Sequence, residues 1–454
     1  RRVEIPKSSD PTKKRPLGIP TIMDRLIQQC ILQVLEPICE AKFHNRSNGF
    51  RPNRSCETAL AQAEKNMQLS KLHYVVDIDI KGFFDNVNHG KLLKQMWTMG
   101  IRDKKLLSII SAMLKAEVAG IGFPEKGTPQ GGIISPLLSN IVLNELDWWI
   151  ASQWETMPTH YKYAKFTDKS GIVADSGRLW ALKHSNLKEC RLVRYADDFK
   201  IFCRKRQDAE KLFIAVKKWL KERLGLDISP EKSKIVNLRE HYSYFLDFKL
   251  KVIEKGKYSN GEKRYVIYSH ISDKASKNIH LKAKQYLCKI QYPDSRETAY
   301  KAVQNYNAFV IGVHNYYRLA TNVSCDFARI AYPVLKSLKT RLKGNISSNG
   351  ICSSLLKERY GKSSQLMYVY GFALIPISYV QHKAPLNKKN SINKYTAEGR
   401  KGIHKKLEAV DMNVLYEMMK NPVKQRSIEY NDNRLSLYCA QKGRCAITKQ
   451  ILKI

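Results

Sequence analysis

The sequence has no long apolar run, no closely spaced pair of cysteines and few acidic residues. No window approaches 18 consecutive apolar residues, which excludes a membrane-spanning helix. The ten cysteines are scattered without a CxxC pair, a pattern that favours reduced thiols in the cytosol over a disulfide framework. Hydrophobic residues still occupy 43% of the 454 positions, so the chain can form real cores and is not wholly disordered.

Acidic residues are outnumbered by basic ones, 41 Asp and Glu against 79 Lys and Arg, which gives a net charge of +38. This excess predicts a polyanionic partner, and neither end carries the basic amphipathic anchor that a membrane surface would need. Residues 251–454 hold 37 basic and 13 acidic residues, a net of +24, and residues 1–250 hold the remaining +14. The second half is therefore predicted to bind, whereas the first half keeps carboxylates that could do chemistry.

Helices and strands are mixed in residues 1–250 without strict alternation, which predicts an α+β fold. Apolar residues at helical spacing predict a helix over residues 23–43, with Asp24 as its start signal. Runs of β-branched residues predict a strand over residues 73–80 and a strand, turn and strand over residues 191–202.

Beyond about residue 268 the pattern becomes helical, and tyrosines are interleaved with Lys and Arg. The clearest helices are predicted over residues 297–319 and 327–342. Residues 383–406 are basic and polar with little apolar periodicity, so they are predicted to be a linker or an exposed binding segment.

Two acidic sites lie in apolar surroundings. Asp77 and Asp79 share one face of a predicted strand, and Asp197 and Asp198 are adjacent in a predicted turn. Carboxylates are costly in such places unless they are paired or bind a metal. If the turn lies beside the strand end, three carboxylates form an oxygen cage for one or two Mg²⁺ ions, which can activate a 3′-hydroxyl and stabilise pyrophosphate. The alternative is that these are ordinary turn and strand-end residues.

Several blocks of the sequence resemble, in order, the reverse transcriptases encoded by group II introns, the intron maturases. The similar blocks are two from the fingers and motifs A to D of the palm: Lys14–Phe43, Gly49–Leu60, Val75–His89, Gly127–Asp147, Arg194–Phe199 and Gly225–Ile235. The resemblance implies a right-hand polymerase with an α-helical thumb, called domain X, and a small basic DNA-binding region. Its expected divisions are fingers and palm over 1–265, thumb over 266–383, DNA-binding domain over 384–432, and the start of an HNH endonuclease domain over 433–454.

The resemblance also assigns the catalytic carboxylates. Asp79, Asp197 and Asp198 match the ligands of two Mg²⁺ ions. Asp79 is preferred to Asp77 because the family places an aromatic residue five positions after its ligand, where Phe84 stands. Phe84 would then be a steric gate that leaves no room for a 2′-hydroxyl and so selects deoxynucleotides. Without the resemblance, core packing is the simpler explanation for Phe84.

A nucleotide-binding set follows from the same resemblance. Gln130, within GTPQGG, matches a position that contacts the incoming nucleotide, and Ile80 belongs to this set beside Asp79. Three basic residues of the fingers are expected to reach the triphosphate: Lys14, Arg15 and Arg25. In a chain with 79 basic residues, ordinary solvated positions are the alternative for each of these three.

A lysine after the last palm motif is expected to donate a proton to pyrophosphate. Lys232 matches the family position, and Lys234 is a competing choice. The family usually has Gly where Asp247 stands, so the geometry of the turn that grips the primer is an open question. 

The second half is implied to bind nucleic acids. Residues 306–320 resemble a recurrent helix of domain X, and residues 393–407 resemble the DNA-binding domain. The expected partners are group II intron RNA, target DNA and deoxynucleoside triphosphates, with no membrane and with the oligomeric state left open. Stacking on tyrosines could hold RNA, although half-buried packing is the commoner role of helical tyrosines.

The chain departs from the full pattern at its ends, starting at Arg1 rather than Met. Residues 434–450 resemble the opening of an HNH endonuclease domain, whose catalytic part would lie beyond Ile454, so endonuclease activity is not expected of this chain. Cys439 and Cys445 are six residues apart, a poor spacing for zinc, so a Zn²⁺ ion there follows only from the resemblance.

The resemblance predicts an RNA-directed DNA polymerase that binds its intron RNA as a splicing maturase. Such a protein copies the intron into DNA at a target site, which is target-primed reverse transcription, or retrohoming. The alternatives are a maturase with little or no polymerase activity, a retron-like reverse transcriptase and a viral RNA polymerase. The three carboxylates argue against a maturase without polymerase activity, and the long domain X argues against a retron-like enzyme. Phe84 argues against a viral RNA polymerase. A bacterial cytoplasmic location, with action at the nucleoid, is expected rather than an organellar one.

Overall fold

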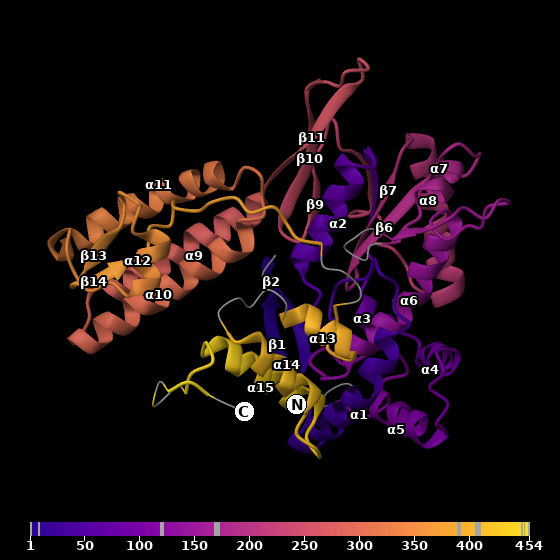
Figure 1. Cartoon of the computed structure of the whole chain (residues 1–454), viewed down its shortest axis with the longest axis horizontal. Coiled ribbons are helices and arrows are strands. Elements are labelled where there is room, and N and C mark those ends of the chain that lie inside the picture. Colours follow the sequence, from indigo (N-terminus) through magenta and orange to yellow (C-terminus); the bar gives the residue numbers. More distant parts are fainter. Residues whose placement is uncertain are drawn as a thin grey trace.

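The structure is a computed structural model of the whole chain. It describes residues 2–7, 10–118, 122–167, 173–387, 392–404, 410–445, 448 and 450–452. Within these ranges no helix is long and apolar enough to cross a membrane. Figure 1 shows a thumb of helices on one side, a palm with its covering helices on the other, and the C-terminal helices beside the N-terminal hairpin.

The palm is built on a four-stranded antiparallel sheet in the order β6-β7-β3-β8. The strands are β3 (Tyr74–Ile78), β6 (Cys190–Tyr195), β7 (Asp198–Cys203) and β8 (Lys234–Asn237). Because side chains alternate along a strand, Val75 and Phe202 enter one core and Val76 and Ile201 enter the other. The sheet is therefore buried on both faces over most of its length, and the predicted α+β class is confirmed.

One face of the sheet is covered by helices from the first half of the chain, whose apolar stripes form a shared core with it. They are α1 (Ile22–Glu40), α4 (His89–Thr98), α5 (Lys104–Leu114), α6 (Ser135–Gln153), α7 (Ser176–Lys183) and α8 (Arg206–Trp219), with α8 continued by the π-helical turn η1 (Leu220–Leu224). The predicted start of α1 is three residues late. Thr21 is the N-cap, and Asp24 closes a capping box with it from the third helical position.

The opposite face packs against α2 (Cys56–Gln68) and a three-stranded sheet that leads into the thumb. This sheet contains β9 (Ser243–Phe245), β10 (Phe248–Lys257) and β11 (Lys263–Ile271). Leu246 and Asp247 have φ values of 51° and 63°, so they form the two-residue turn with positive φ that suits a twisted hairpin. Asp247 thus keeps the hairpin where the family usually has Gly. The boundary predicted at residue 265 falls inside β11.

The thumb consists of three long helices with a small sheet at their far end (Figure 1). Its elements are α9 (Asp273–Gln291), α10 (Arg296–Tyr317), α11 (Val323–Leu342), η2 (Lys343–Asn345), β12 (Ile346–Ser347), α12 (Ser354–Tyr360), β13 (Met367–Val369) and β14 (Phe372–Leu374). Tyr306 is buried in this core, whereas Tyr300 and Tyr332 are exposed. Packing therefore explains Tyr306, whereas Tyr292, Tyr300 and Tyr332 lie on the surface.

The C-terminal region forms one small unit rather than two. It contains α13 (Ala397–His404), α14 (Met412–Lys420) and α15 (Ile428–Ala440). Leu415 of α14 shares a core with Leu435 and Tyr438 of α15, so the boundary predicted at residue 432 cuts through a helix. Residues 383–406 were predicted to be a linker or an exposed binding segment, and α13 forms within them. Residues 405–407 of the predicted DNA-binding segment lie outside the described residues.

The N-terminal hairpin, a one-turn helix and a short pair of strands complete the fold. The hairpin of β1 (Arg2–Lys7) and β2 (Asp10–Gly18) reaches toward the loop that precedes α6, because the Gly18 N–H donates to the Gln130 carbonyl at 2.7 Å. The one-turn helix α3 (Phe83–Asn86) follows β3, and β4 (Phe166–Thr167) pairs with β5 (Val173–Ala174). The hairpin and α3 place their residues next to the end of the palm sheet.

A buried histidine, His314, ties α10 to the distal part of the thumb. Its Nε2 lies 2.8 Å from the Ile377 carbonyl and its Nδ1 lies 3.1 Å from the Tyr360 hydroxyl. Both contacts suit a neutral ring that donates from Nε2 and accepts at Nδ1. Burial, with a smaller contribution from the nearby Arg359, lowers the pKa of His314 to about 4, and the Ile377 hydrogen bond opposes this shift.

We expect the thumb to lose stability in mild acid because unfolding frees His314 to take a proton. The unfolded pKa near 6.5 exceeds the folded value, so the contribution is complete above pH 6.5 and is lost as the pH falls toward 4. Between pH 7 and pH 5 this amounts to about 1–2 kcal/mol. Urea unfolding at both pH values should show a smaller loss for His314→Gln than for the wild type. Equal losses would contradict the assignment.

Candidate active site

The register of the palm strands brings the predicted carboxylates to one end of the sheet. β3 pairs with β7 so that Asp77 faces Lys200 and Ile78 faces Phe199. Continuing this register by one residue places Asp79 across from Asp198. β6 and β7 close where Tyr195 pairs with Asp198, so Ala196 and Asp197 form the hairpin turn. Asp79, Asp197 and Asp198 therefore lie at the same end of the sheet, which we call the palm edge.

A buried lysine separates Asp77 from this group. Lys200 Nζ lies 2.6 Å from Asp77 Oδ1 and 3.8 Å from Asp198 Oδ1, and its side chain is only 2% exposed. Asp77 also accepts a hydrogen bond from Ser243 Oγ at 3.4 Å. Asp77 therefore compensates the charge of Lys200 inside the sheet, while Asp79 lies at the open end. This geometry supports the choice of Asp79 over Asp77.

The carboxylate of Asp198 lies near three other acidic side chains. Burial among protein atoms raises the pKa of Asp198 to about 6, Lys200 opposes the shift, and the negative charges of Asp77, Asp197 and Asp79 add to it. The side chain nevertheless has 44% of its surface open to solvent on its free side, so water screens part of this effect. A cation at this edge would relieve the repulsion between the carboxylates.

The donor chemistry fits magnesium. Asp79, Asp197 and Asp198 offer only carboxylate oxygens, the hard ligands that Mg²⁺ prefers. In the ranges that the structure describes, no three His, Cys, Asp or Glu side chains are already grouped to hold an ion. Instead Asp79 Oδ1 contacts Lys232 Nζ at 3.5 Å, and Asp198 faces Lys200. Binding a metal would therefore require the acidic side chains to turn from lysines toward one another.

Of the two candidate lysines, Lys232 is the one that contacts the site. It is exposed, and its ammonium group forms the ion pair with Asp79. The segment that carries it is fastened to β3, because the Ser229 N–H donates to the Asp79 carbonyl at 2.8 Å and the Asp79 N–H donates to Ser233 Oγ at 3.2 Å. Lys234 lies opposite Asp77 in the sheet and is further from the edge.

The loop that carries Gln130 is pinned between α3 and the N-terminal hairpin. The Thr128 N–H donates to the Phe84 carbonyl at 2.7 Å, and Gln130 Nε2 lies 3.4 Å from Asp85 Oδ1. Gly131 has φ +110°, and an added Cβ there would lie 2.3 Å from the Gly18 carbonyl oxygen. Close approach of two backbones thus brings Phe84, Gln130 and the end of β2 together, and only glycine permits it.

Phe84 is half-buried. Its ring lies edge-to-face with Phe83 at a centroid distance of 5.3 Å and packs against the palm core. Phe83 is fully inside the core, whereas part of Phe84 stays exposed to solvent. Packing and a role as a gate are therefore compatible in this position.

The remaining members of the nucleotide-binding set differ in their placement. Lys14 on β2 is exposed and lies 3.2 Å from Glu4 of β1. Arg15 also lies on β2, but its side chain is outside the described part of the chain, and Arg25 is exposed in the first turn of α1. Ile80 is only 5% exposed and belongs to the core. Any contact of Ile80 with a nucleotide would therefore come from its main chain.

Two buried basic residues near the carboxylates were not predicted from the sequence. Lys200 interrupts the apolar strand β7, and Arg194 interrupts the apolar strand β6. Arg194 is fully buried and pairs with Asp147 of α6. The available signal was the same one that identified the acidic residues, a charged side chain in an apolar strand. 

The C-terminal cysteines do not support the zinc expectation. Cys439 is buried in the small core of α14 and α15, and Cys445 follows that helix in a turn. In the part of the chain that the structure describes, no group of three potential ligands surrounds them.

An antiparallel sheet with acidic residues at the edge of a hairpin, a glycine-rich loop and a half-buried aromatic beside it defines the palm of a nucleic-acid polymerase. The chain belongs to the family described as reverse transcriptase (RNA-dependent DNA polymerase), whose model matches residues 5–258. The shared region covers the fingers and palm up to the β10–β11 hairpin.

Three curated relatives extend the comparison. Group II intron-encoded protein LtrA of Lactococcus lactis subsp. cremoris is 30% identical over 402 residues, covering 76% of this chain and 65% of LtrA. Protein YkfC of Escherichia coli K12 is 32% identical over 277 residues, covering 59% and 69%. A putative COX1/OXI3 intron 2 protein of Saccharomyces cerevisiae is 28% identical over 410 residues, covering 80% and 46%. The chain thus spans slightly less than two thirds of LtrA.

Among solved structures, telomerase from Candida tropicalis with a fragment of telomeric RNA overlaps 96% of this chain and 63% of the telomerase chain. The TM-score is 0.41 at 12% identity. The family assignment rests on the sequence matches and not on this similarity.

We expect Gly131→Ala to impair nucleotide use, because the new methyl group collides with the Gly18 carbonyl and moves the Gln130 loop from α3. A displacement of this kind should lower kcat/KM for the incoming nucleotide by about 100-fold. Single-nucleotide extension of a primer on an RNA template measures the effect.

The matched control is Gly312→Ala in α10, where an added Cβ meets no atom within 4 Å. It should leave kcat/KM unchanged and raise thumb stability by about 0.5–1 kcal/mol. Equal kcat/KM for Gly131→Ala and the wild type would show that the loop does not position the nucleotide.

Proposed function

We propose that this protein is an RNA-directed DNA polymerase that also binds a group II intron RNA as a splicing maturase. The observation that carries the polymerase activity is the meeting of Asp79 with the Asp197–Asp198 turn at one edge of the palm sheet. The family match over residues 5–258 supports the same reaction. 

The carboxylates would hold two Mg²⁺ ions. When bound, such ions supply an activated 3′-hydroxyl and neutralise charge on the departing pyrophosphate. Lys200 pairs with Asp77 inside the sheet, and the carboxylates of Asp79, Asp197 and Asp198 would turn from their present partners toward the ions. Lys232, already 3.5 Å from Asp79, is placed to give a proton to the pyrophosphate oxygen as it leaves.

Selection of the nucleotide would fall to the residues around the glycine-rich loop. Gln130 lies beside the one-turn helix α3, which also carries the partly exposed Phe84. A ring beneath the sugar would exclude a 2′-hydroxyl by contact, which selects deoxynucleoside triphosphates. Lys14 and Arg15, both on β2, would approach the triphosphate from the fingers, since β2 ends on the Gln130 carbonyl.

The intron RNA is proposed as the natural ligand of the thumb and fingers. The curated relatives include a group II intron-encoded protein and a nuclear intron maturase of Arabidopsis thaliana, the latter 28% identical over 173 residues. The net charge of +24 over residues 251–454 supports binding of a large polyanion through phosphate contacts. Copying of the bound intron at a target DNA would then use the basic C-terminal unit.

The carboxylate assignment predicts that Asp197→Asn and Asp198→Asn each lower nucleotide incorporation by at least about 100-fold, because a metal ligand is lost. RNA binding should stay at the wild-type level, since neither residue lies in the thumb. Primer extension on an RNA template with Mg²⁺ and filter binding of intron RNA measure the two effects.

Asp227→Asn is the matched control, because it removes a carboxylate whose ion pair with Lys221 is exposed. It should leave incorporation unchanged. A wild-type protein that binds intron RNA and promotes its splicing but extends no primer would overturn the polymerase proposal and leave a maturase without polymerase activity.

For the sugar gate, we expect Phe84→Ala to admit ribonucleotides, lowering the preference for deoxynucleotides by at least about tenfold. The ratio of kcat/KM for dCTP and CTP measures it. Phe83→Leu is the control, since Phe83 is buried behind Phe84 and should affect stability without changing the ratio. An unchanged ratio in Phe84→Ala would leave this residue a packing role only.

A further inference from the structure

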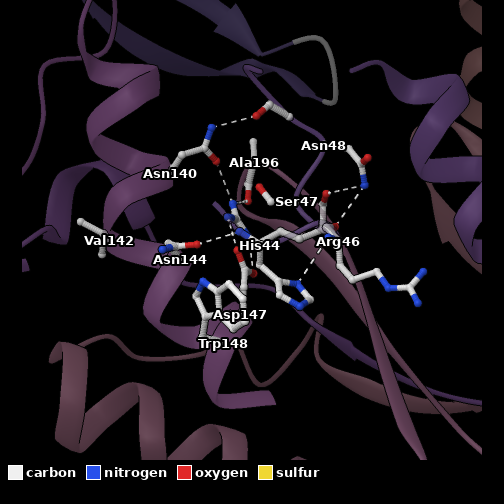
Figure 2. A network of polar contacts seen from close by, with 12 residues as sticks. His44, Arg46, Ser47, Asn48, Asn140, Val142, Asn144, Asp147, Trp148 and Ala196 are labelled. Carbon is white, nitrogen blue, oxygen red and sulfur yellow. Dashed lines mark hydrogen bonds and ion pairs between the residues drawn. The ribbon is translucent and has the colours of Figure 1, made fainter. Parts of the chain in front are cut away.

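A fully buried ion pair lies behind the turn that carries Asp197 and Asp198. Arg194 and Asp147 are both 0% exposed. Arg194 is two residues beyond Leu192 on β6, so both side chains point to the face opposite the carboxylates, toward α6. Figure 2 shows Asn140 and Asp147 of α6 reaching toward Ala196 of the turn.

The guanidinium of Arg194 connects helix α6 to that turn. Its Nε and Nη2 donate to the two carboxylate oxygens of Asp147 at 2.7 and 2.6 Å. Its Nη1 donates to Asn140 Oδ1 at 2.9 Å and to the Ala196 carbonyl oxygen at 2.8 Å. A bidentate pair fixes the plane of the guanidinium, so the direction of the Nη1 bond to Ala196 is fixed as well.

Ala196 needs such support. Its φ of 57° places a residue with a Cβ in the left-handed region, at the first central position of a two-residue hairpin turn where glycine is usual. Strained backbone of this kind persists only where its surroundings hold it. The carbonyl that Arg194 binds belongs to the peptide that leads into Asp197, so its direction sets how the acidic pair is presented.

A second clamp reaches the same turn from the fingers. The Asn48 N–H donates to the Arg194 carbonyl at 2.8 Å, and the Arg194 N–H donates to the Arg46 carbonyl at 2.9 Å. Asn140 Nδ2 donates to the Gly49 carbonyl at 2.8 Å. A Cβ on Gly49 would lie 2.2 Å from the Ala196 nitrogen, so the backbone of the finger segment lies in close contact with the turn.

Net stability is a weak explanation for this arrangement. Burying an arginine and an aspartate costs desolvation that their attraction roughly repays, and apolar replacements of such pairs are often as stable. The bidentate pairing with Asp147 fixes the orientation of the Arg194 guanidinium, and an apolar pair would not do so.

We propose that Arg194, with Asp147 and Asn140, forms a positioning network that holds the Ala196 turn and thereby presents Asp197 and Asp198 at the palm edge. The network touches neither nucleotide nor primer and acts through the turn. The proposal rests on the proposed function for the role of the two carboxylates, but the geometry of the turn can be measured without activity.

The test removes the pair without leaving an orphan charge. The variant Arg194→Met/Asp147→Leu is compared with Arg191→Met/Glu189→Leu. The comparison variant removes a second buried pair away from the turn, formed by Arg191 of β6 and by Glu189, which precedes this strand and also pairs with Arg204. A third variant, Asn140→Ala, keeps both charges and loses the links to Arg194 and Gly49. Each is measured by hydrogen exchange of residues 195–199, by Mn²⁺ titration followed by electron paramagnetic resonance, and by steady-state primer extension on poly(rA) with oligo(dT).

In Arg194→Met/Asp147→Leu we expect amide exchange in the turn to rise by about tenfold or more. Mn²⁺ affinity should fall by a similar factor, and kcat should fall by about 100-fold with KM for the template and primer unchanged. The same changes, smaller in size, are expected for Asn140→Ala. The Arg191 control should keep wild-type exchange in the turn and wild-type Mn²⁺ affinity.

Wild-type exchange and Mn²⁺ affinity in Arg194→Met/Asp147→Leu, or equal changes in the Arg191 control, would overturn the proposal. If the double variant does not fold, Asn140→Ala decides the question by the same two measurements. A wild-type protein without DNA synthesis would sink the proposed function alone, because exchange in the turn does not depend on catalysis.

Discussion

The pairing register of β3 with β7 decides where the acidic side chains of the palm lie, and most of the site depends on it. Side chains alternate along a strand, so a slip of one residue would put Asp79 and Asp198 on opposite faces of the sheet. Val75 and Val76 enter two different cores, and both would be misplaced by the same slip. Burial on both faces of the sheet therefore holds the carboxylates at the open edge.

At this end of the palm sheet, the two faces of the sheet have different roles. Lys200 and Asp77 lie on the carboxylate side and keep a buried positive charge compensated next to Asp198. Arg194 lies on the other side and connects the turn to α6 and the fingers. Most of the excess charge of the chain is elsewhere, in residues 251–454. The basic residues proposed to bind a polyanion and the carboxylates proposed to carry the reaction are thus separated in the sequence and are combined only in the folded molecule.

Much of this architecture could be predicted because local patterns specify local structure. The strand at residues 73–80, the hairpin around Asp197 and most long helices follow from apolar periodicity. Boundaries were less accurate. Thr21 caps α1 in place of Asp24, because capping depends on hydrogen bonds that periodicity does not report. The divisions that the resemblance implied at residues 265 and 432 fall inside β11 and α15.

The sequence by itself determined the chemistry available: carboxylates in apolar strands, glycines before α6, an aromatic after Asp79 and a basic second half. It could not show which charged groups compensate one another, since Asp77 and Lys200 are 123 residues apart and Arg194 and Asp147 are 47 apart. Only the tertiary structure decided that Asp77 is paired with a buried lysine, that Asp79 lies at the solvent-exposed end of the sheet and that a buried arginine supports the turn. The physical reason is that a charge is neutralised by what lies near it in space, which sequence spacing alone does not reveal.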